Sequence, residues 1–334
     1  MKRIAVIGAG SWGTALAIMA ARSGHDVVLW SRNDELVKTI NSTRTNPRYL
    51  SSTIIPDHVD ITNDLSAALS DARIVIFAAP SHATRYLFTA MKSALKSSSI
   101  IVSAAKGIEI DSGKRVSEVV NDVLETEVRD RFVCLSGPSF AKEVVENHPT
   151  AIVAASHNES TACEVQTDLS VNNLRIYTNS DVVGTELGGS VKNVMAIAAG
   201  MAAGLGYGSN SVAALITRGL AEITRLALTQ GAQPETLMGL AGLGDLVLTC
   251  TGNLSRNRFV GNELGKGRTL AEITQNMTEI AEGIKTSRAV KRLAERAGVE
   301  MPITNEVDAV LYDGKSASEA VAELIKRPLR SETT

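Results

Sequence analysis

The hydrophobic residues in the first half of the chain gather into short continuous runs, and segments with helical spacing lie between them. The runs predict strands at residues 3–8, 26–30, 73–79, 100–104, 132–136 and 151–155. The helical spacing predicts helices at residues 11–23, 34–41 and 82–96. Strands that are apolar along their length and alternate with helices are typical of a parallel sheet that helices cover on both faces.

The pattern changes near residue 178, and no convincing strand is predicted from residue 181 onward. Apolar positions at helical spacing instead predict helices at residues 181–203, 211–230, 255–264, 269–277, 287–297, 304–312 and 317–325. A chain of 334 residues is longer than one hydrophobic core usually supports. We therefore predict an α/β domain at residues 1–180 and an all-helical domain at residues 181–334, tightly packed because no flexible linker separates them.

The composition is that of an ordinary globular protein, with 44% hydrophobic and 21% charged residues. A formal net charge of −2 gives no reason to expect a nucleic-acid partner. The longest weakly apolar stretch, residues 194–206, is shorter than the ~20 residues that span a bilayer, so no integral membrane segment is expected. The three cysteines are odd in number and widely separated, which argues against a disulfide framework or a cysteine zinc site and favours a reduced, cytoplasmic protein.

A glycine-rich turn joins the first predicted strand to the first predicted helix. Residues 8–13 fit the pattern G-x-G-x-x-G through Gly8, Gly10 and Gly13. Such glycines allow a tight turn, close approach of a pyrophosphate and close packing of helix on strand, and the helix N-terminus offers free N–H groups to the phosphates. Because strand, turn and helix come in the required order, the pattern predicts a dinucleotide-binding Rossmann domain. A purely structural turn is the alternative.

The residue after the second strand bears on which dinucleotide binds. A site for NAD usually has Asp or Glu there for the ribose 2′-hydroxyl, whereas this chain has Arg32. A guanidinium at this position can pair with a 2′-phosphate, so we expect NADPH to be preferred, with NADH as the other candidate. The alternative is a solvated Arg32 with Asp34 or Glu35 as its partner.

Two further segments follow predicted strands, where ligands bind in open α/β sheets. Lys106 comes shortly after the strand at residues 100–104 and is placed to reach a substrate anion or carbonyl. Residues 136–141 include Gly137 and Ser139, so this turn can present backbone N–H groups and a hydroxyl. A solvated lysine and an ordinary strand-to-helix turn are the alternatives.

Two charged residues stand out in the helical half. Lys192 lies in a predicted helix among small and apolar neighbours, where lysine is rare unless it is paired or functional. Burial and a second cation would lower its pKa and suit it to proton transfer; the alternative is a lysine whose ammonium reaches the surface. Asp245 ends the glycine-rich segment 239–245 and could orient this lysine and a substrate hydroxyl, or only cap a helix.

The segment 255–258 has the pattern of a helix that begins at an anion site. Ser255 is predicted to be the N-cap, with Arg256 and Asn257 in the first turn. First-turn N–H groups and a guanidinium together form an anion pocket, for which a phosphate is the natural occupant. A capped helix with exposed arginines is the alternative.

Together these segments resemble the bacterial-type NAD(P)-dependent glycerol-3-phosphate dehydrogenases along essentially the whole chain. The resemblance is carried by residues 6–17, 46–50, 104–108, 136–141, 191–194, 196–200, 239–251, 255–258 and 279–283. Several such segments in this order and at these spacings are far more specific than the glycine turn alone. The chain departs from the family at residues 251–254, where relatives often have Asp and Gln before Ser-Arg-Asn, and at Ser139, which can be Thr.

The resemblance implies an oxidoreductase that reversibly reduces dihydroxyacetone phosphate to sn-glycerol 3-phosphate, the backbone precursor of phospholipids. It implies that Lys192 donates the proton and that the substrate is held by Lys106, Gly137, Ser139, Lys192, Asp245, Ser255, Arg256 and Asn257. Besides the three glycines of the turn, the implied cofactor contacts are Ser11, Trp12, Arg32, Tyr49, Lys106, Ala141, Arg256, Ile280 and Glu282. A cytoplasmic homodimer without a catalytic metal is also implied, with a C-terminal domain of the 6-phosphogluconate-dehydrogenase-like kind.

Two other interpretations stay open. A dehydrogenase of the β-hydroxyacid or 6-phosphogluconate type would share this architecture and also use a lysine on the first helix after the sheet. That type typically has an asparagine several residues after the lysine, whereas here Asn193 is adjacent and Ala196 stands at the four-residue spacing. A dinucleotide sensor without activity would keep residues 8–13 but would not need Lys106, Lys192 and the other charged side chains.

Overall fold

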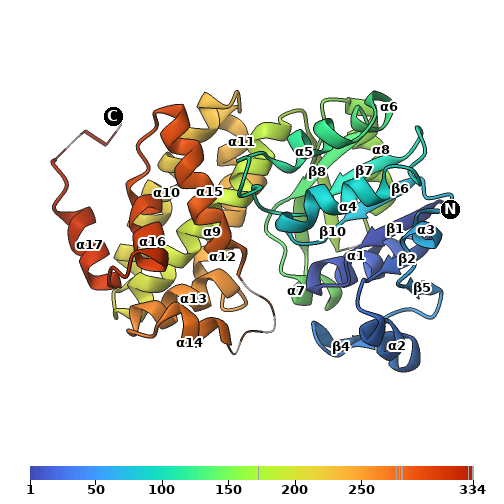
Figure 1. Ribbon diagram of the computed structural model, residues 1–334, viewed down its shortest axis with the longest axis horizontal. Coiled ribbons are helices and arrows are strands. Elements are labelled where there is room, and N and C mark those ends of the chain that lie inside the picture. The colour runs from blue at the N-terminus through green and yellow to red at the C-terminus, as the bar shows by residue number, and fades with distance from the viewer. Residues whose placement is uncertain (172, 276, 278, 280, 330, 333–334) are drawn as a thin grey trace.

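The structure is a computed structural model that describes residues 1–171, 173–275, 277, 279, 281–329 and 331–332. Figure 1 shows a sheet-containing half and a helical half side by side. The last described strand ends at Asn179, and the described residues after it form helices and loops. The predicted order of an α/β half followed by an all-helical half is therefore confirmed.

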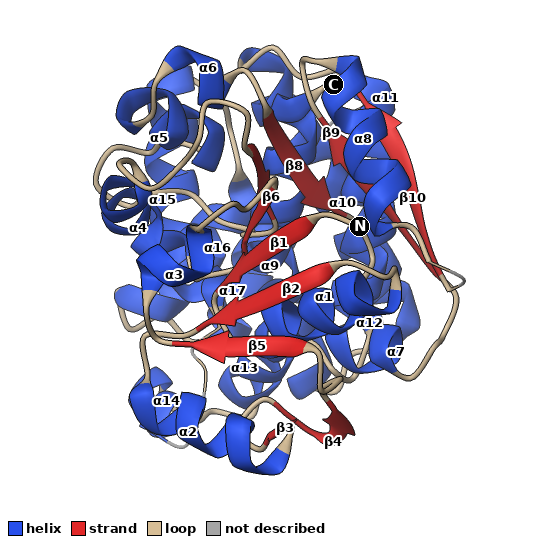
Figure 2. Cartoon of the chain, turned by 90° about the vertical axis from the view of Figure 1, so that its right-hand side faces the viewer, coloured by secondary structure: helices blue, strands red, loops and turns tan. Residues whose placement is uncertain are grey.

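One sheet of eight strands forms the centre of the first half, in the order β10-β9-β8-β7-β6-β1-β2-β5 (Figure 2). The strands are β1 (Arg3–Ile7), β2 (Asp26–Trp30), β5 (Val59–Thr62), β6 (Ile74–Phe77), β7 (Ile100–Ser103), β8 (Phe132–Ser136), β9 (Thr150–Ala155) and β10 (Leu174–Asn179). β1 pairs in parallel with β2 on one side and with β6 on the other, so that Ile4 lies between Val27 and Ile74. The carboxyl ends of these three strands consequently meet at one edge of the sheet.

The pair of β8 and β9 is antiparallel, which corrects the fully parallel sheet that the sequence predicts. The connection between them, residues 137–149, holds only the short helix α7 (Ala141–Val145). A parallel pair needs a crossover to the opposite edge, whereas this connection stays at the edge where β8 ends, so β9 runs back. β10 then pairs in parallel with β9.

The sequence pattern does not predict β5, β10 or the hairpin of β3 (Thr45–Asn46) and β4 (Leu50–Ile54). β5 and β10 are the two edge strands of the large sheet. In β5, buried Val59 and Ile61 flank exposed Asp60. A short strand with one exposed face carries a weaker apolar signal than a central strand that is buried on both faces.

Helices cover both faces of the sheet, because successive side chains of a central strand point to opposite faces. In β1, Ile4 and Val6 pack in the core under α1, whereas Ala5 and Ile7 pack in the core under α4. The helices of this half, besides α7, are α1 (Ser11–Arg22), α2 (Asp34–Thr43), α3 (Leu65–Leu69), η1 (Ser81–Ala83), α4 (Thr84–Met91), α5 (Val116–Val123), α6 (Thr126–Arg129) and α8 (Glu159–Leu169).

The helical half is built around α9 (Val182–Gly204), which is buried along almost its whole length. The helices of this half that follow α9 are α10 (Ser209–Thr229), α11 (Pro234–Met238), η2 (Leu240–Gly244), α12 (Asp245–Thr251), α13 (Arg256–Gly265), α14 (Leu270–Gln275), α15 (Glu282–Ala297), α16 (Pro302–Tyr312) and α17 (Ala317–Ile325). Among the described residues, no helix combines the length and apolar character that a membrane crossing requires. The described part of the chain also contains no cluster of His, Cys, Asp and Glu that could hold a metal ion.

Candidate active site

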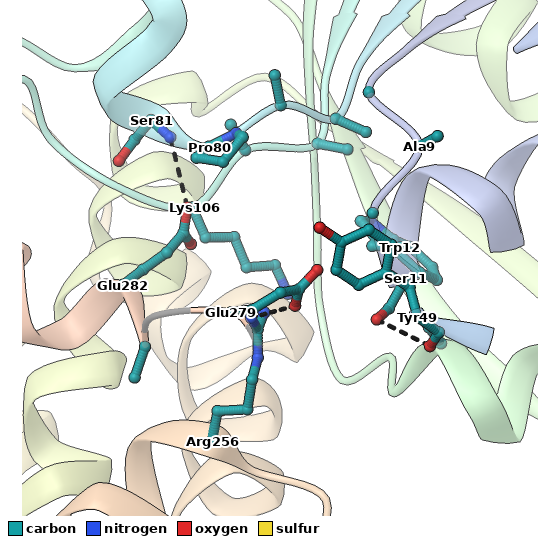
Figure 3. Close-up of a pocket in the computed structure, with 18 of the residues that line it drawn as sticks. Ala9, Ser11, Trp12, Tyr49, Pro80, Ser81, Lys106, Arg256, Glu279 and Glu282 are labelled. Carbon is teal, nitrogen blue, oxygen red and sulfur yellow. Dashed lines mark hydrogen bonds and ion pairs between the residues drawn. The ribbon is translucent and has the colours of Figure 1, made fainter. Parts of the chain in front are cut away.

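A cleft of about 970 Å³ lies between the carboxyl ends of the strands and the helical half (Figure 3). The predicted site residues that line it are Gly8, Gly10, Ser11, Trp12, Arg32, Tyr49, Lys106, Ser139, Ala141, Lys192, Asp245, Ser255, Arg256, Asn257 and Glu282. Gly13 and Gly137 are absent from this lining. Ile280, a predicted cofactor contact, lies outside the described residues.

The glycine turn after β1 forms one wall of the cleft. Gly8 has a positive φ of 119°, and a Cβ there would lie 2.9 Å from the backbone of Ala78 and Ala79, so this position needs glycine. A Cβ on Gly13 would overlap the carbonyl oxygen of Gly8, which explains the close packing of α1 on the turn. No side chain caps α1 at Gly10 in the described structure, so N–H groups of the first turn remain for an anion. The turn therefore fits a dinucleotide pyrophosphate.

Asn46 holds the segment that carries Tyr49 against this turn. The buried side-chain amide of Asn46 donates to the carbonyl oxygen of Ala9 at 2.9 Å and to Thr14 Oγ1 at 2.8 Å. Ser11 Oγ then donates to the carbonyl oxygen of Tyr49 at 3.2 Å (Figure 3). These bonds keep Tyr49 beside the glycine turn, at the place where the sequence predicts a cofactor contact.

Two lysines and one carboxylate meet in the inner part of the cleft. Lys192 Nζ on α9 donates to Asp245 Oδ1 at 2.7 Å and to Thr249 Oγ1 at 2.6 Å. Lys106 Nζ donates to Asp245 Oδ2 at 2.7 Å and to the carbonyl oxygen of Gly137 at 3.1 Å. The side chain of Lys192 is only 6% exposed, so its ammonium does not reach the surface.

The surroundings shift the pKa values of Lys192 and Asp245. Burial and, to a smaller extent, the positive charge of Lys106 lower the pKa of Lys192 to about 8, although Asp245 opposes the shift. Burial acts to raise the pKa of Asp245, but the two ammonium groups outweigh burial and lower it. An ammonium with a pKa near 8 beside a permanent carboxylate can both give and take a proton near neutral pH.

The turn after β8 supports Lys106. Gly137 has a positive φ of 135°, and a Cβ there would lie 2.9 Å from Cα of Ile152, so no larger residue fits without movement. Its carbonyl oxygen accepts from both Lys106 Nζ and, at 2.9 Å, Ser139 Oγ. Gly137 thus acts through its backbone, while the hydroxyl of Ser139 borders the cleft.

The start of α13 carries the residues of the predicted anion pocket. Ser255 is the N-cap, as predicted, and its Oγ accepts from the backbone N–H of Arg258 at 3.2 Å. Arg256 is half-exposed and forms an ion pair with Glu279 (Figure 3). Asn257 Nδ2 donates to Asn193 Oδ1 at 3.0 Å, and Asn257 Oδ1 accepts from the N–H of Gly283 at 2.9 Å.

Arg32 and Glu282 lie at other parts of the cleft wall. Arg32 is exposed, and no ion pair to it is found among the described residues; Asp34 pairs instead with Lys38 at 2.6 Å. Glu282 Oε1 accepts from the N–H of Ser81 at 3.4 Å, which links α15 to the loop after β6. Burial raises the pKa of Glu282, and the bond from Ser81 opposes this.

Comparison with known proteins finds similarity to one enzyme family along nearly the whole chain. The family model for the NAD-dependent glycerol-3-phosphate dehydrogenase N-terminus matches residues 3–162, and the model for the C-terminus of the same family matches residues 181–322. A glycerol-3-phosphate dehydrogenase [NAD(P)+] from Koribacter versatilis is 54% identical over 99% of both chains. The chain belongs to this family.

Two further relatives of this glycerol-3-phosphate dehydrogenase family are similar over nearly their full length. The glycerol-3-phosphate dehydrogenase [NAD(P)+] of Citrifermentans bemidjiense is 50% identical over 99% of both chains. The crystal structure of glycerol-3-phosphate dehydrogenase from Coxiella burnetii superposes with a TM-score of 0.93 at 40% identity, covering 98% of this chain and 99% of that one. The predicted resemblance is therefore confirmed at the level of the family.

Several side chains that line this family member's cleft were not predicted, among them Thr249, Asn193 and Glu279. Thr249 lies one helical turn after Asp245 on α12, a spacing that could have indicated its contact with Lys192. Asn193 directly follows Lys192 and contacts Asn257, but adjacency in a helix does not predict a shared face. Glu279 reaches Arg256 from the segment before α15, and no local pattern indicates that contact.

Proposed function

We propose that the chain catalyses the reversible reduction of dihydroxyacetone phosphate to sn-glycerol 3-phosphate with NAD(P)H, and that Lys192 is the proton donor. As a member of this family the chain is an NAD(P)-dependent oxidoreductase. The observation that carries the residue assignment is the buried Lys192–Asp245–Lys106 cluster at the inner part of the cleft. A buried, paired lysine in a cleft is typical of acid–base chemistry.

The residues that line the cleft support a place for each part of the cofactor. The glycine turn and the first turn of α1 would hold the pyrophosphate, because they offer free N–H groups and the glycines have no side chains of their own. Ser11, Trp12, Tyr49, Ala141 and Glu282 line the same space. A bound nicotinamide supplies a hydride to the carbonyl carbon of the substrate.

Lys192 and Lys106 act on the substrate carbonyl oxygen in this proposal. Negative charge develops on that oxygen as the carbon is reduced, and two ammonium groups stabilise it. Lys192 then gives its proton to the oxygen and takes it back in the reverse direction. Asp245 orients both ammonium groups, and Thr249 accepts a hydrogen bond from Lys192. The pKa of about 8 for Lys192 suits both directions near neutral pH.

The start of α13 is the proposed site of the substrate phosphate. Arg256 contributes a guanidinium, Ser255 and Asn257 lie beside it, and the N-terminus of this ten-residue helix favours an anion. Ser139 and the ammonium of Lys106 border the space between this helix and the sheet. Binding the phosphate away from the reacting carbon would orient the substrate carbonyl for the chemical step.

The remaining parts of the proposal rest on the resemblance and on Arg32. They are a preference for NADPH, a division into an NAD(P)-binding domain at residues 1–180 and a catalytic domain at residues 181–334, assembly as a homodimer, and a cytoplasmic role in supplying the phospholipid backbone. The exposed guanidinium of Arg32, which has no ion-pair partner among the described residues, supports the cofactor preference.

The reaction is tested by following NADPH oxidation with dihydroxyacetone phosphate, with unphosphorylated dihydroxyacetone and with keto acids, and by repeating each assay with NADH. We expect turnover that depends on the phosphate and is faster with NADPH. Turnover of keto acids alone would favour the β-hydroxyacid type of enzyme. NADPH binding without turnover of any of these substrates would favour a dinucleotide sensor.

A further inference from the structure

We propose that Arg32, His82 and Lys285 together form a pocket for the 2′-phosphate of NADPH, and that Lys285 is a specificity-determining residue contributed by the helical half. This inference rests on the proposed use of NADPH and names the groups that would recognise it. All three side chains line the cleft. They come from three different elements, which the fold brings to one region.

The sheet topology places Arg32 and His82 at the same edge. Arg32 follows β2, and His82 lies in η1, shortly after β6. β2 and β6 both pair in parallel with β1, one on each side, so Arg32 and His82 flank the glycine turn that follows β1. In a Rossmann domain the ribose nearest the second strand lies at this edge. Both side chains are therefore within the region where the 2′-phosphate is expected.

α15 brings Lys285 to the same region. Its first residue, Glu282, accepts a hydrogen bond from the N–H of Ser81 at 3.4 Å, and Ser81 is the chain neighbour of His82. Lys285 follows Glu282 by three residues, so the two side chains lie on the same face of this helix. Glu282 and Lys285 both line the cleft, so the start of α15 lies beside the loop that carries His82.

Arg32, His82 and Lys285 have no carboxylate partner in the described part of the chain. Asp34, two residues after Arg32, pairs with Lys38. Of the acidic residues that line the cleft, Glu279 pairs with Arg256 and Glu282 accepts from the N–H of Ser81. Burial, and then the charges of Lys285 and Arg32, lower the pKa of His82, which supports their closeness. His82 is therefore a neutral imidazole near neutral pH and would donate a ring N–H to the phosphate, while Arg32 and Lys285 supply the positive charge. Positive groups without partners in a cleft favour a ligand of high negative charge.

The other anion sites of the cleft are already assigned. The pyrophosphate would take the N–H groups at the start of α1, and the substrate phosphate would take Arg256 at the start of α13. Of the anionic groups in NADPH and the substrate, only the 2′-phosphate is then left for Arg32, His82 and Lys285. NADH lacks this phosphate, so the pocket would distinguish the two cofactors.

The test compares the binding of 2′,5′-ADP with that of 5′-AMP by calorimetry, because the two ligands differ in the 2′-phosphate. Lys285→Ala, His82→Gln and Arg32→Ala are each expected to raise the Kd for 2′,5′-ADP roughly tenfold and to leave the Kd for 5′-AMP unchanged. Arg292→Ala removes a charge from an exposed position of the same helix and is the matched control, with no expected effect. In steady-state assays, Lys285→Ala should raise KM for NADPH and not for NADH.

The inference is overturned if Lys285→Ala weakens both ligands equally, or weakens neither. Equal weakening of both ligands by His82→Gln would place His82 against the adenosine and remove it from the phosphate pocket. Failure of the proposed reaction gives a different result: the wild-type chain would bind 2′,5′-ADP more tightly than 5′-AMP and yet turn over no dihydroxyacetone phosphate with either cofactor.

Discussion

The ammonium of Lys192 and the carboxylate of Asp245 lie 2.7 Å apart in the inner part of the cleft, and both side chains are almost fully buried. Lys106 pairs with the other oxygen of the same carboxylate, also at 2.7 Å. One carboxylate therefore faces two ammonium groups. The two ammonium groups keep Asp245 ionised. Burial, with a smaller contribution from the charge of Lys106, brings the deprotonated form of Lys192 within reach of neutral pH.

The pKa of Lys192, about 8, sets the expected pH dependence of both directions of the reaction. Reduction needs the ammonium form, so kcat/KM for dihydroxyacetone phosphate should fall about tenfold per pH unit above this pKa. Oxidation of glycerol 3-phosphate needs the neutral amine, so its kcat/KM should rise through the same pH. Both profiles are measured above about pH 7, where the substrate phosphate stays dianionic. A reduction rate that rises with pH there would contradict the role of Lys192.

Asp245 is expected to influence the reaction through the two lysines. Asp245→Asn removes a charge that raises the pKa of Lys192, so this pKa should fall and the decline in reduction should begin at lower pH. Loss of one member of a buried charge cluster should also lower kcat/KM, on the order of 100-fold. Thr249→Val removes a hydrogen bond to Lys192 but no charge, and its profile should keep the wild-type midpoint. An unchanged midpoint in Asp245→Asn would limit Asp245 to a structural role.

Glu279 forms an ion pair with Arg256, so in the proposed site it would compete with the substrate phosphate for this guanidinium. Glu279→Gln should release the guanidinium and lower KM for dihydroxyacetone phosphate several-fold, with a smaller effect on kcat. Inhibition by inorganic phosphate should become stronger in the same variant. Glu263→Gln is the control, since Glu263 pairs with Lys266 and Arg268 and does not line the cleft. A higher KM in Glu279→Gln would mean that this carboxylate helps to form the site.

Glu222 should make the stability of the helical half depend on pH. It accepts from the N–H of Ile303 at 2.7 Å and so caps α16, but burial raises its pKa to about 7 despite these bonds. A carboxyl whose pKa is raised by folding favours the folded state below the unfolded pKa of about 4.3, and this contribution is lost as the pH rises through about 7.

Urea unfolding measures this effect. The unfolding midpoint of the wild-type chain should fall more between about pH 5 and pH 8 than that of Glu222→Gln, which has no titrating group at this position. The difference between the two chains removes the contributions of the groups that they share. Equal falls in both chains would show that Glu222 does not titrate in this range.

The local parts of the fold and of the site could be predicted from the sequence. Gly8, Gly10 and Gly13 lie within one strand–turn–helix unit, so their spacing was enough to predict the turn. The N-cap at Ser255 and the buried helix α9 depend on nearest neighbours in the same way. The central strands were predicted because burial on both faces leaves a continuous apolar run.

Features that depend on distant segments could not be predicted in this way. The edge strands β5 and β10 have one exposed face, and the direction of β9 depends on where its connection packs. Residues 106, 192 and 245 were each found as candidates, yet only the tertiary structure shows one carboxylate between two lysines. The contact of Arg256 with Glu279 likewise depends on the position of a loop.

The role of Lys192 is tested most directly by measuring turnover and NADPH binding in Lys192→Ala. The variant should lose turnover by roughly 1,000-fold, because proton donation and part of the oxyanion stabilisation disappear together. NADPH binding, followed by fluorescence titration, should stay within about twofold of the wild-type chain, because the proposed cofactor contacts lie elsewhere in the cleft. Turnover close to wild type, or loss of NADPH binding along with turnover, would contradict the assignment of Lys192 as the proton donor.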